Sequence, residues 1–196
     1  MPHTAIDPVP VACEIVLALQ TMMTRRISAF DPAVLTVGSV QAGTTANVIP
    51  SSVTVRLTVR AVSEEARAAI VQGVRRVADH VAAAHLCGAE IQAPDMGYPV
   101  TVSDPELTEQ VLDIAARTLG GSRVVRMPAP VLAGEDWSFV LQQVPGCLAA
   151  LGAAPPDVAE PAPIHSDRMV LDEMAVVTGI ALHSAVALSP AVGDDA

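Results

Sequence analysis

The stretch Val53-Thr54-Val55-Arg56-Leu57-Thr58-Val59-Arg60 alternates strictly between apolar and polar residues. Side chains along a β-strand point alternately to opposite faces, so this pattern predicts a strand with one buried and one exposed face. A second apolar run, Val34 to Val40, comes before it, and the turn Asn47-Val48-Ile49-Pro50 lies between the two. We therefore expect an antiparallel strand pair at the centre of the N-terminal half.

Amphipathic helices are expected on both sides of this strand pair. Residues 7–25 open with Asp7-Pro8, a capping residue followed by proline at the first helical position, and continue with apolar residues at helical spacing. A second helix is expected at residues 64–84, capped by Ser63, and a short strand at residues 89–92. The order helix, strand, strand, helix, strand is that of a ferredoxin-like α+β sandwich without its first strand.

The second half of the sequence has a different rhythm, because helical segments there alternate with apolar or proline-rich runs. The apolar run bounded by Gly146 and Gly152 is typical of a buried parallel strand. The other expected elements are a helix that starts at 103–106 and ends at Leu119, a short helix at 137–143, an exposed loop at 153–163 and a final helix at 172–188. These elements predict the closing part of an α/β layer.

The change of pattern divides the sequence into two expected domains and a tail. Residues 1–95 are expected to form the ferredoxin-like domain, and residues 96–190 the α/β portion. Residues 191–196 are expected to fray, as chain ends without apolar anchors do.

Composition excludes several classes of function. The chain has 21 acidic and 11 basic residues, a net charge of −10, and no Lys/Arg run longer than two, so it lacks the basic surface that binds nucleic acid. No stretch approaches 18 uninterrupted apolar residues, and the first residues do not pair a basic segment with an apolar one, so we expect no membrane partner and a cytoplasmic location. The three cysteines form no Cys-x-x-Cys pair that would indicate structural zinc.

Three further segments carry a family resemblance: Gln-Ala-Gly-Thr-Thr-Ala-Asn-Val-Ile-Pro at 41–50, Ala-Gly-Glu-Asp-Trp-Ser-Phe at 133–139, and Ile-His-Ser-Asp at 164–167. In that order they resemble the co-catalytic zinc metallopeptidases and amidohydrolases, the family of hippurate hydrolase, aminoacylases and plant auxin-conjugate hydrolases. The resemblance runs from about Pro2 to about Leu188. The family's Cys-Gly-His-Asp segment, its Glu-Glu pair and a further metal-binding His are absent from this sequence.

The resemblance implies the C-terminal part of such an enzyme. Its fold would be a ferredoxin-like lid that lacks its first strand and forms homodimers, followed by the end of an α/β zinc-peptidase-like catalytic domain. The intact family enzyme holds two divalent metal ions, zinc, manganese or similar, and cleaves N-acyl amino acids. A chain without most metal ligands and without the glutamate proton shuttle is expected to be inactive alone.

His165 is the candidate metal ligand. A neutral imidazole is a natural ligand for a divalent transition metal, yet a histidine in a proline-rich loop is more commonly solvent-exposed. The resemblance implies that His165 is the family's last metal ligand, with Asp172-Glu173 following at the matching offset. One imidazole alone does not hold zinc, which takes three or four protein ligands.

Asn47 and Arg60 are candidate substrate-binding residues. An amide and a guanidinium together suit a free carboxylate, and the resemblance implies that both face the family's cleft. The alternative is that Asn47 supports the turn through its own backbone hydrogen bonds and that Arg60 is a solvated strand residue.

Glu135 and Asp136 form a third candidate site, because paired acids at a strand end often line a crevice. Glu135 is the residue that would face the metal cleft. In the competing interpretation Asp136 caps the helix that begins at Trp137 and Glu135 is solvated. His3 matches a Pro-His pair that opens the lid helix in the family.

Three hypotheses for function follow. In the first, the chain is part of a metal-dependent amidohydrolase that cleaves N-acyl amino acids or small peptides. In the second, it is a noncatalytic dimerisation or binding module derived from that family. An unrelated ferredoxin-like binding domain would account for residues 1–95, but it leaves the segments at Gly134 and His165 as coincidences.

Overall fold

The computed structural model describes residues 1–92 and 97–189. The chain divides into two compact units, one formed by residues 1–101 with 130–138, the other by residues 102–129 with 139 onward. The tail expected at 191–196 lies outside the described residues. Each unit is described by itself.

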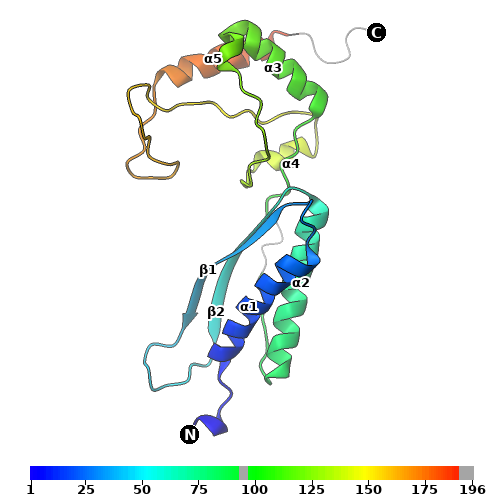
Figure 1. Cartoon of the computed structure of the whole chain (residues 1–196), viewed down its shortest axis with the longest axis vertical. Coiled ribbons are helices and arrows are strands. Elements are labelled where there is room, and N and C mark those ends of the chain that lie inside the picture. Colours follow the sequence, from blue (N-terminus) through cyan, green and yellow to red (C-terminus); the bar gives the residue numbers. More distant parts are fainter. Residues whose placement is uncertain (93–96, 190–196) are drawn as a thin grey trace. The chain divides into compact units, whose positions relative to one another are not determined.

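An antiparallel strand pair forms the centre of the N-terminal unit, as the sequence predicts. Strands β1 (Ala33–Ala42) and β2 (Val53–Ala61) pair with Val37 opposite Leu57, and the register shifts by one residue at Gly38 (Figure 1). Along β2 half-buried apolar residues alternate with exposed polar ones, so the predicted alternation is confirmed.

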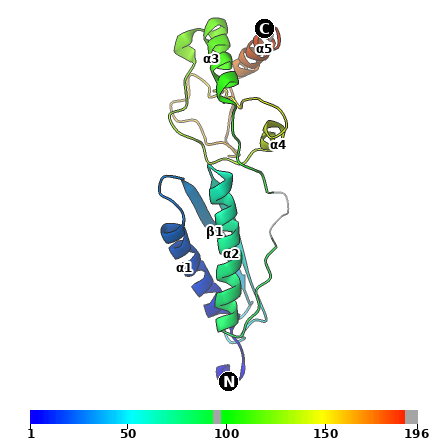
Figure 2. The same cartoon turned by 90° about the vertical axis from the view of Figure 1, so that its right-hand side faces the viewer.

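Helices α1 (Pro8–Arg26) and α2 (Glu64–Ala84) cover one face of this pair (Figure 2). The predicted caps are present. The Asp7 carboxylate accepts a 2.9 Å hydrogen bond from the amide of Val9, and Ser63 Oγ accepts one of 3.0 Å from the amide of Ala66. Each cap satisfies an amide at the helix start that has no intrahelical partner.

The core of this unit lies between the helices and the strands. Leu19, Met22, Leu35 and Ile70 are buried together, with Ile70 0% exposed. Gly73 contributes by having no side chain, because a Cβ atom there would overlap the sulfur of Met22. Small residues on α2 thus let the two helices approach closely.

The strand expected at residues 89–92 is wrong. Residues 86–92 contain no strand or bridge, and the sheet among the described residues has two strands. A strand forms only where a neighbour supplies ladder hydrogen bonds, and no described segment pairs with this one. The arrangement of two helices and two strands is present, without the third strand of the expected order.

Helix α2 ends in a Schellman motif with leucine in the position that favours glycine. The amide of Cys87 donates to the carbonyl of Ala82 at 2.9 Å, and the amide of Leu86 donates to that of Ala83 at 3.1 Å. Leu86 has φ of 60° and is exposed. A Cβ atom makes this left-handed conformation costly.

We expect Leu86→Gly to stabilise this unit by about 0.5–1 kcal/mol. Relief of the left-handed strain gains about 1–2 kcal/mol, and the greater freedom of glycine in the unfolded chain removes about 0.5–1 kcal/mol of that. Urea unfolding followed by circular dichroism measures the change. Leu86→Ala is the matched control, because it removes the same exposed side chain and keeps the Cβ atom. Equal stabilities of the two variants would show that the left-handed conformation does not strain a side chain at position 86.

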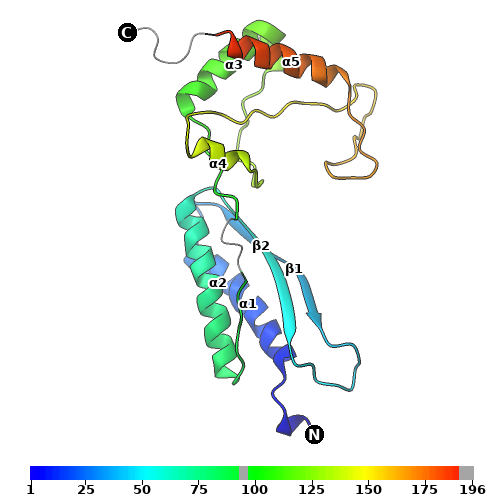
Figure 3. The ribbon, with the colours of Figure 1, turned by 180° about the vertical axis from the view of Figure 1, so that it is seen from behind.

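The second unit is mainly helical. Helix α3 (Pro105–Leu119) starts and ends where the sequence predicts, with Leu119 as its last residue before Gly120. At its start the Asp104 carboxylate accepts a 2.9 Å hydrogen bond from the amide of Leu107. It packs against α5 (Met174–Ala187) (Figure 3). The remaining short elements of the chain are α4 (Trp137–Leu141) and the 3-10 helices Pro2–Thr4 and Gly121–Arg123. No helix in the described ranges has the length and apolar character to cross a bilayer.

The buried parallel strand expected at residues 146–152 is also wrong. This segment has no strand in the structure, and Leu148 and Leu151 are 51% and 46% exposed. The described part of the chain offers no parallel neighbour beside which the apolar run could be buried.

Helix α5 has apolar residues around its whole circumference, and they are largely exposed. Met174, Val176, Val177 and Ile180 are each more than half exposed, and no residue of α5 is buried. A helix that is apolar all round is typical of a protein interior. The second unit therefore displays an apolar surface larger than scattered single residues would give.

Candidate functional site

Arg60 lies near the end of β2, on the face opposite to that of Leu57 and Val59, which pack against the helices. Its guanidinium approaches the backbone of Gly134. A Cβ atom on Gly134 would lie 2.6 Å from Nη1 of Arg60 and 3.2 Å from Cδ2 of Tyr98. The structure thus brings together Arg60, Tyr98 and the Gly134-Glu135-Asp136 segment, all within the N-terminal unit.

The segment that carries Tyr98 is fixed to the start of α2. Glu64 Oε1 accepts a 2.6 Å hydrogen bond from the amide of Val100, while Oε2 pairs with Nε of Arg67 at 2.8 Å. Burial acts to raise the pKa of the Glu64 carboxyl, but the hydrogen bonds from Val100 and Arg67 outweigh it and lower the pKa below its ordinary value. Glu64 is therefore an anionic anchor for this segment at neutral pH.

The Glu135 and Asp136 side chains are both exposed. The carbonyl of Glu135 accepts hydrogen bonds from the amide of Ser138 at 3.2 Å and from its buried hydroxyl at 2.6 Å. Within the described ranges neither carboxylate makes a hydrogen bond or ion pair, so the structure does not show the cap expected from Asp136. Ser138 thus holds the turn through the backbone, and both carboxylates are exposed to solvent.

Asn47 and Arg60 are not brought together. Asn47 lies in the loop that joins β1 to β2, and Arg60 lies at the opposite end of β2 (Figure 3). From Val53 to Arg60 the strand spans about 23 Å at roughly 3.3 Å per residue. One chain therefore does not hold a single carboxylate with both side chains. Asn47 is exposed, and its side chain makes no hydrogen bond with any described residue.

We expect Asn47→Ala to change the free energy of unfolding by less than about 0.5 kcal/mol, because no intramolecular hydrogen bond of its side chain is lost. A side chain that supports a turn would cost about 1 kcal/mol on removal. Thermal and urea unfolding of the variant distinguish these values. A loss near the larger figure would restore the turn-supporting interpretation.

His165 occupies a strained turn. The amide of Ser166 donates to the carbonyl of Pro163 at 3.1 Å, and His165, the third residue of this turn, has φ of 70°. A type II turn requires positive φ at that position and favours glycine or asparagine there. Histidine tolerates the conformation better than most residues, and such strain concentrates at functional sites. The side chain is exposed.

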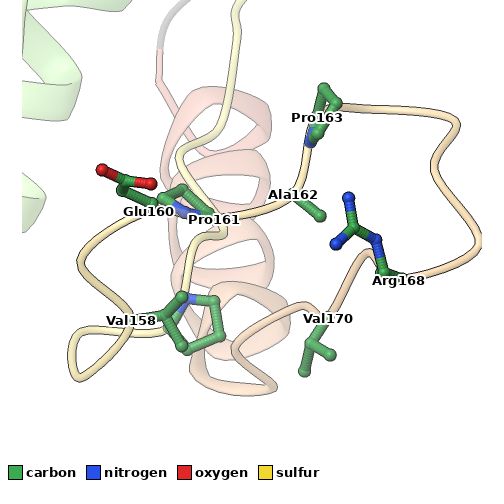
Figure 4. Close-up of a pocket in the computed structure, with 8 residues that line it drawn as sticks. Val158, Glu160, Pro161, Ala162, Pro163, Arg168 and Val170 are labelled. Carbon is green, nitrogen blue, oxygen red and sulfur yellow. The ribbon is translucent and has the colours of Figure 1, made fainter.

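The residues that the structure describes do not make a metal site by themselves. Among residues 1–92 and 97–189, no three His, Cys, Asp or Glu side chains are grouped so that they could hold a metal ion. A hollow lies within the loop that carries His165, but His165 does not line it. Arg168 points into this hollow and Glu160 points away from it (Figure 4). His3, in the first 3-10 helix, is exposed.

Two residues of the site are not identified by the sequence pattern. Tyr98 is a single aromatic residue in an irregular segment, and nothing in its spacing links it to β2. Gly134 carries a weaker signal, since a glycine directly before two acids indicates a close approach of the backbone. Only the fold shows that the guanidinium of Arg60 makes that approach.

Comparison with known proteins identifies consistent relatives. The family model described as peptidase family M20/M25/M40 matches residues 6–189. Thermostable carboxypeptidase 2 of Saccharolobus solfataricus is 29% identical over 95% of this chain and 47% of its own length. IAA-amino acid hydrolase ILR1-like 2 of Arabidopsis thaliana is 32% identical over 96% of this chain and 43% of its own length. N-acetyl-L-cysteine deacetylase of Bacillus subtilis is 34% identical over 78% and 36%.

Solved structures agree with these relatives. A protein from methicillin-resistant Staphylococcus aureus has a TM-score of 0.77 at 28% identity and covers 95% of this chain and 47% of its own. The Bacillus subtilis YxeP protein, described as a dinuclear metal-binding peptidase, has a TM-score of 0.72 at 28% identity, with 94% and 46% covered. The chain thus spans about half the length of the relatives it matches.

Proposed function

Because this chain belongs to peptidase family M20/M25/M40, we propose that it is part of a metal-dependent amidohydrolase that cleaves N-acyl amino acids, hippurate-like compounds or small peptides. The names of two relatives describe hydrolysis of an N-acyl amino acid, and a third is a carboxypeptidase. Such substrates share a free carboxylate beside the amide bond. A protein that acts on them needs a group that orients this carboxylate.

The observation that carries the proposal is the position of Arg60. The residue is exposed, its guanidinium has no ion pair within the described ranges, and Nη1 lies against Gly134, the residue before Glu135. A guanidinium can bind a carboxylate through two parallel hydrogen bonds, which fixes orientation as well as position. Arg60 is the proposed carboxylate anchor, and Glu135 lines the same site. Asn47 then contacts another part of the substrate or another chain.

The domain roles are proposed on the same basis. Residues 1–95 act as a ferredoxin-like lid that forms homodimers, and residues 96–190 are the C-terminal portion of an α/β catalytic domain. The exposed apolar circumference of α5 supports the second role, because such a helix is stable when further polypeptide covers it. The two-stranded sheet supports the first, since an uncovered sheet edge accepts another strand.

His165 is proposed as one ligand of a metal site whose other ligands lie outside this chain. The support is the strained turn that presents its imidazole. Zinc takes three or four protein ligands, and the described residues do not supply them. The residues present therefore do not fit a complete metal centre, and we expect the chain alone to lack the acid–base group and the nucleophile that amide hydrolysis needs.

Hydrolysis assays on the purified chain test this expectation. With hippurate and other N-acyl amino acids, and with zinc, manganese or cobalt added, we expect no turnover above the metal-only control. Loss of a general base alone costs about 10²- to 10⁴-fold, and loss of the metal-activated water removes the nucleophile. Metal-dependent hydrolysis that disappears in His165→Ala would show instead that the chain is a minimal enzyme.

The second candidate function is a noncatalytic dimerisation module. Its support is the outer edge of β1, which pairs with no strand among residues 1–92 and 97–189, because two such edges can pair between copies. Both candidates predict a dimer, so oligomeric state does not separate them. Binding of N-acyl amino acids through Arg60 does, since a module without a substrate has no need of a carboxylate anchor.

A further inference from the structure

The open face of the strand pair has an unusual charge pattern for this chain. On β2 the exposed positions are Thr54, Arg56, Thr58 and Arg60. Neither strand contains Asp or Glu, although the chain has 21 acidic and 11 basic residues. The two strands therefore carry two positive charges and no negative one in a protein whose net charge is −10.

Both arginines of this face are available to a ligand. In the part of the chain that the structure describes, neither Arg56 nor Arg60 forms an ion pair or a side-chain hydrogen bond, and both are exposed. Arg60 lies beside Gly134, whereas Arg56 lies further from that end of the strand. Helices α1 and α2 lie on the opposite face of the strand pair (Figure 2).

Uncharged hydroxyl side chains lie between the two arginines, and they can form hydrogen bonds with a ligand. Thr58 lies between them on β2, and across the pair Thr36 is opposite Thr58 and Ser39 is opposite Arg56. The Cα atoms of Arg56 and Arg60 are about 13 Å apart at roughly 3.3 Å per residue, and strand side chains lean along the strand. Because these long side chains can lean toward each other, the two guanidinium groups can bind carboxylates roughly 8 Å apart, which is the extended spacing of the two carboxylates in an amino acid that carries a five-carbon dicarboxylic acyl group.

We propose that Arg56 and Arg60 bind the two ends of a doubly anionic substrate. Arg60 takes the amino-acid carboxylate, a step that rests on the proposed function, and Arg56 takes a second carboxylate at the end of the acyl group. The substrate class is then N-acyl amino acids whose acyl chain is a dicarboxylic acid. Arg56 is a specificity-determining residue, because it discriminates between acyl groups with and without a terminal charge.

Nucleic acid is a poorer fit to the same two arginines. A phosphate backbone needs many cations in a stripe and is helped by aromatic stacking, and the strands supply two arginines and no aromatic residue. Net charge of −10 also repels a polyanion at long range. A short ligand with two carboxylates needs only the two guanidinium groups.

A titration of the full chain tests the inference with N-glutaryl-L-phenylalanine and N-pentanoyl-L-phenylalanine. The two ligands have five-carbon acyl groups and differ in the terminal carboxylate. Isothermal calorimetry or NMR at low salt gives the dissociation constants. We expect the glutaryl ligand to bind about five- to tenfold more tightly, as one charge-assisted contact at an exposed site provides.

Variants of the two arginines test their proposed roles separately. Arg56→Gln should remove the preference for the glutaryl ligand and leave the affinity for the pentanoyl ligand unchanged. Arg60→Gln should lower the affinity for both ligands. Arg75→Gln, an exposed position on α2, is the matched control for loss of one positive charge. Circular dichroism confirms that each variant is folded.

Two results would overturn the inference: equal binding of both ligands by the wild-type chain, including no binding of either, and equal weakening of both ligands by Arg56→Gln. Where wild-type binding is measurable, the proposed function still stands if Arg60→Gln weakens binding of the pentanoyl ligand. If wild-type binding is measurable and Arg60→Gln changes the affinity for neither ligand, Arg60 is not the carboxylate anchor and the proposed function is contradicted instead.

Discussion

Ile70→Ala is expected to lower the free energy of unfolding of the N-terminal unit by about 2–5 kcal/mol. Ile70 is 0% exposed and lies in the cluster with Leu19, Met22 and Leu35, where α1 and α2 meet the strands. The substitution removes buried apolar groups and leaves a cavity that the packed helices fill only partly. Since both helices and β1 contact this cluster, the loss affects the whole unit.

Urea unfolding followed by circular dichroism measures this loss, and Leu17→Ala provides the control. Leu17 is on α1 but 69% exposed, so its truncation should change stability by less than about 0.5 kcal/mol. A cost for Ile70→Ala no larger than that of Leu17→Ala would mean that the helices are not packed on the strands as described.

Arg60→Gln is expected to lower the catalytic efficiency of the complete enzyme. In an enzyme completed by the metal-binding part that we propose lies outside this chain, it should lower kcat/KM for an N-acyl amino acid by about 1.5–3 kcal/mol, or roughly 10- to 150-fold. The reason is the loss of a charge-assisted contact with the substrate carboxylate. Gln keeps a polar side chain of similar reach at an exposed position, so stability should be unchanged.

Steady-state kinetics with matched acid and amide substrates check this prediction. The amide has no carboxylate, so Arg60→Gln should lower its kcat/KM much less than that of the acid. Equal losses on both substrates, together with a lower melting temperature, would mean that Arg60 supports the fold and does not hold the substrate.

Local signals in the sequence predict the helices and the strand pair well. Asp7, Ser63 and Asp104 each cap the helix that follows, because a short oxygen-bearing side chain satisfies a free amide wherever the helix packs. The alternation along Val53 to Arg60 likewise sets its two faces by itself. These features depend on neighbouring residues only.

The strands expected at 89–92 and 146–152 show where local signals fail. An apolar or β-prone run becomes a strand only beside a hydrogen-bonding neighbour, and the sequence of the run does not say whether one is present. The described residues offer none to either run. The apolar surface of α5 has the same origin, since its pattern is that of a helix with neighbours on every side.

The candidate site, too, could be predicted only in part from the sequence. Family resemblance selects Arg60 and His165, but it does not predict the distance along β2 that separates Asn47 from Arg60. Nor does any local pattern place Tyr98 beside Gly134, because their proximity depends on the fold of residues far apart in the chain. These tertiary relations explain why Arg60 alone, without Asn47, carries the proposed carboxylate contact.

Carboxylate-dependent binding by the full chain tests whether Arg60 anchors the substrate carboxylate. Hippurate and its amide, which differ only in the carboxylate, are titrated into the wild-type chain and into Arg60→Gln. We expect wild type to bind hippurate about tenfold more tightly than the amide, and Arg60→Gln to bind the two equally. Equal binding of acid and amide by wild type, or an undiminished preference for the acid in Arg60→Gln, would contradict this role of Arg60.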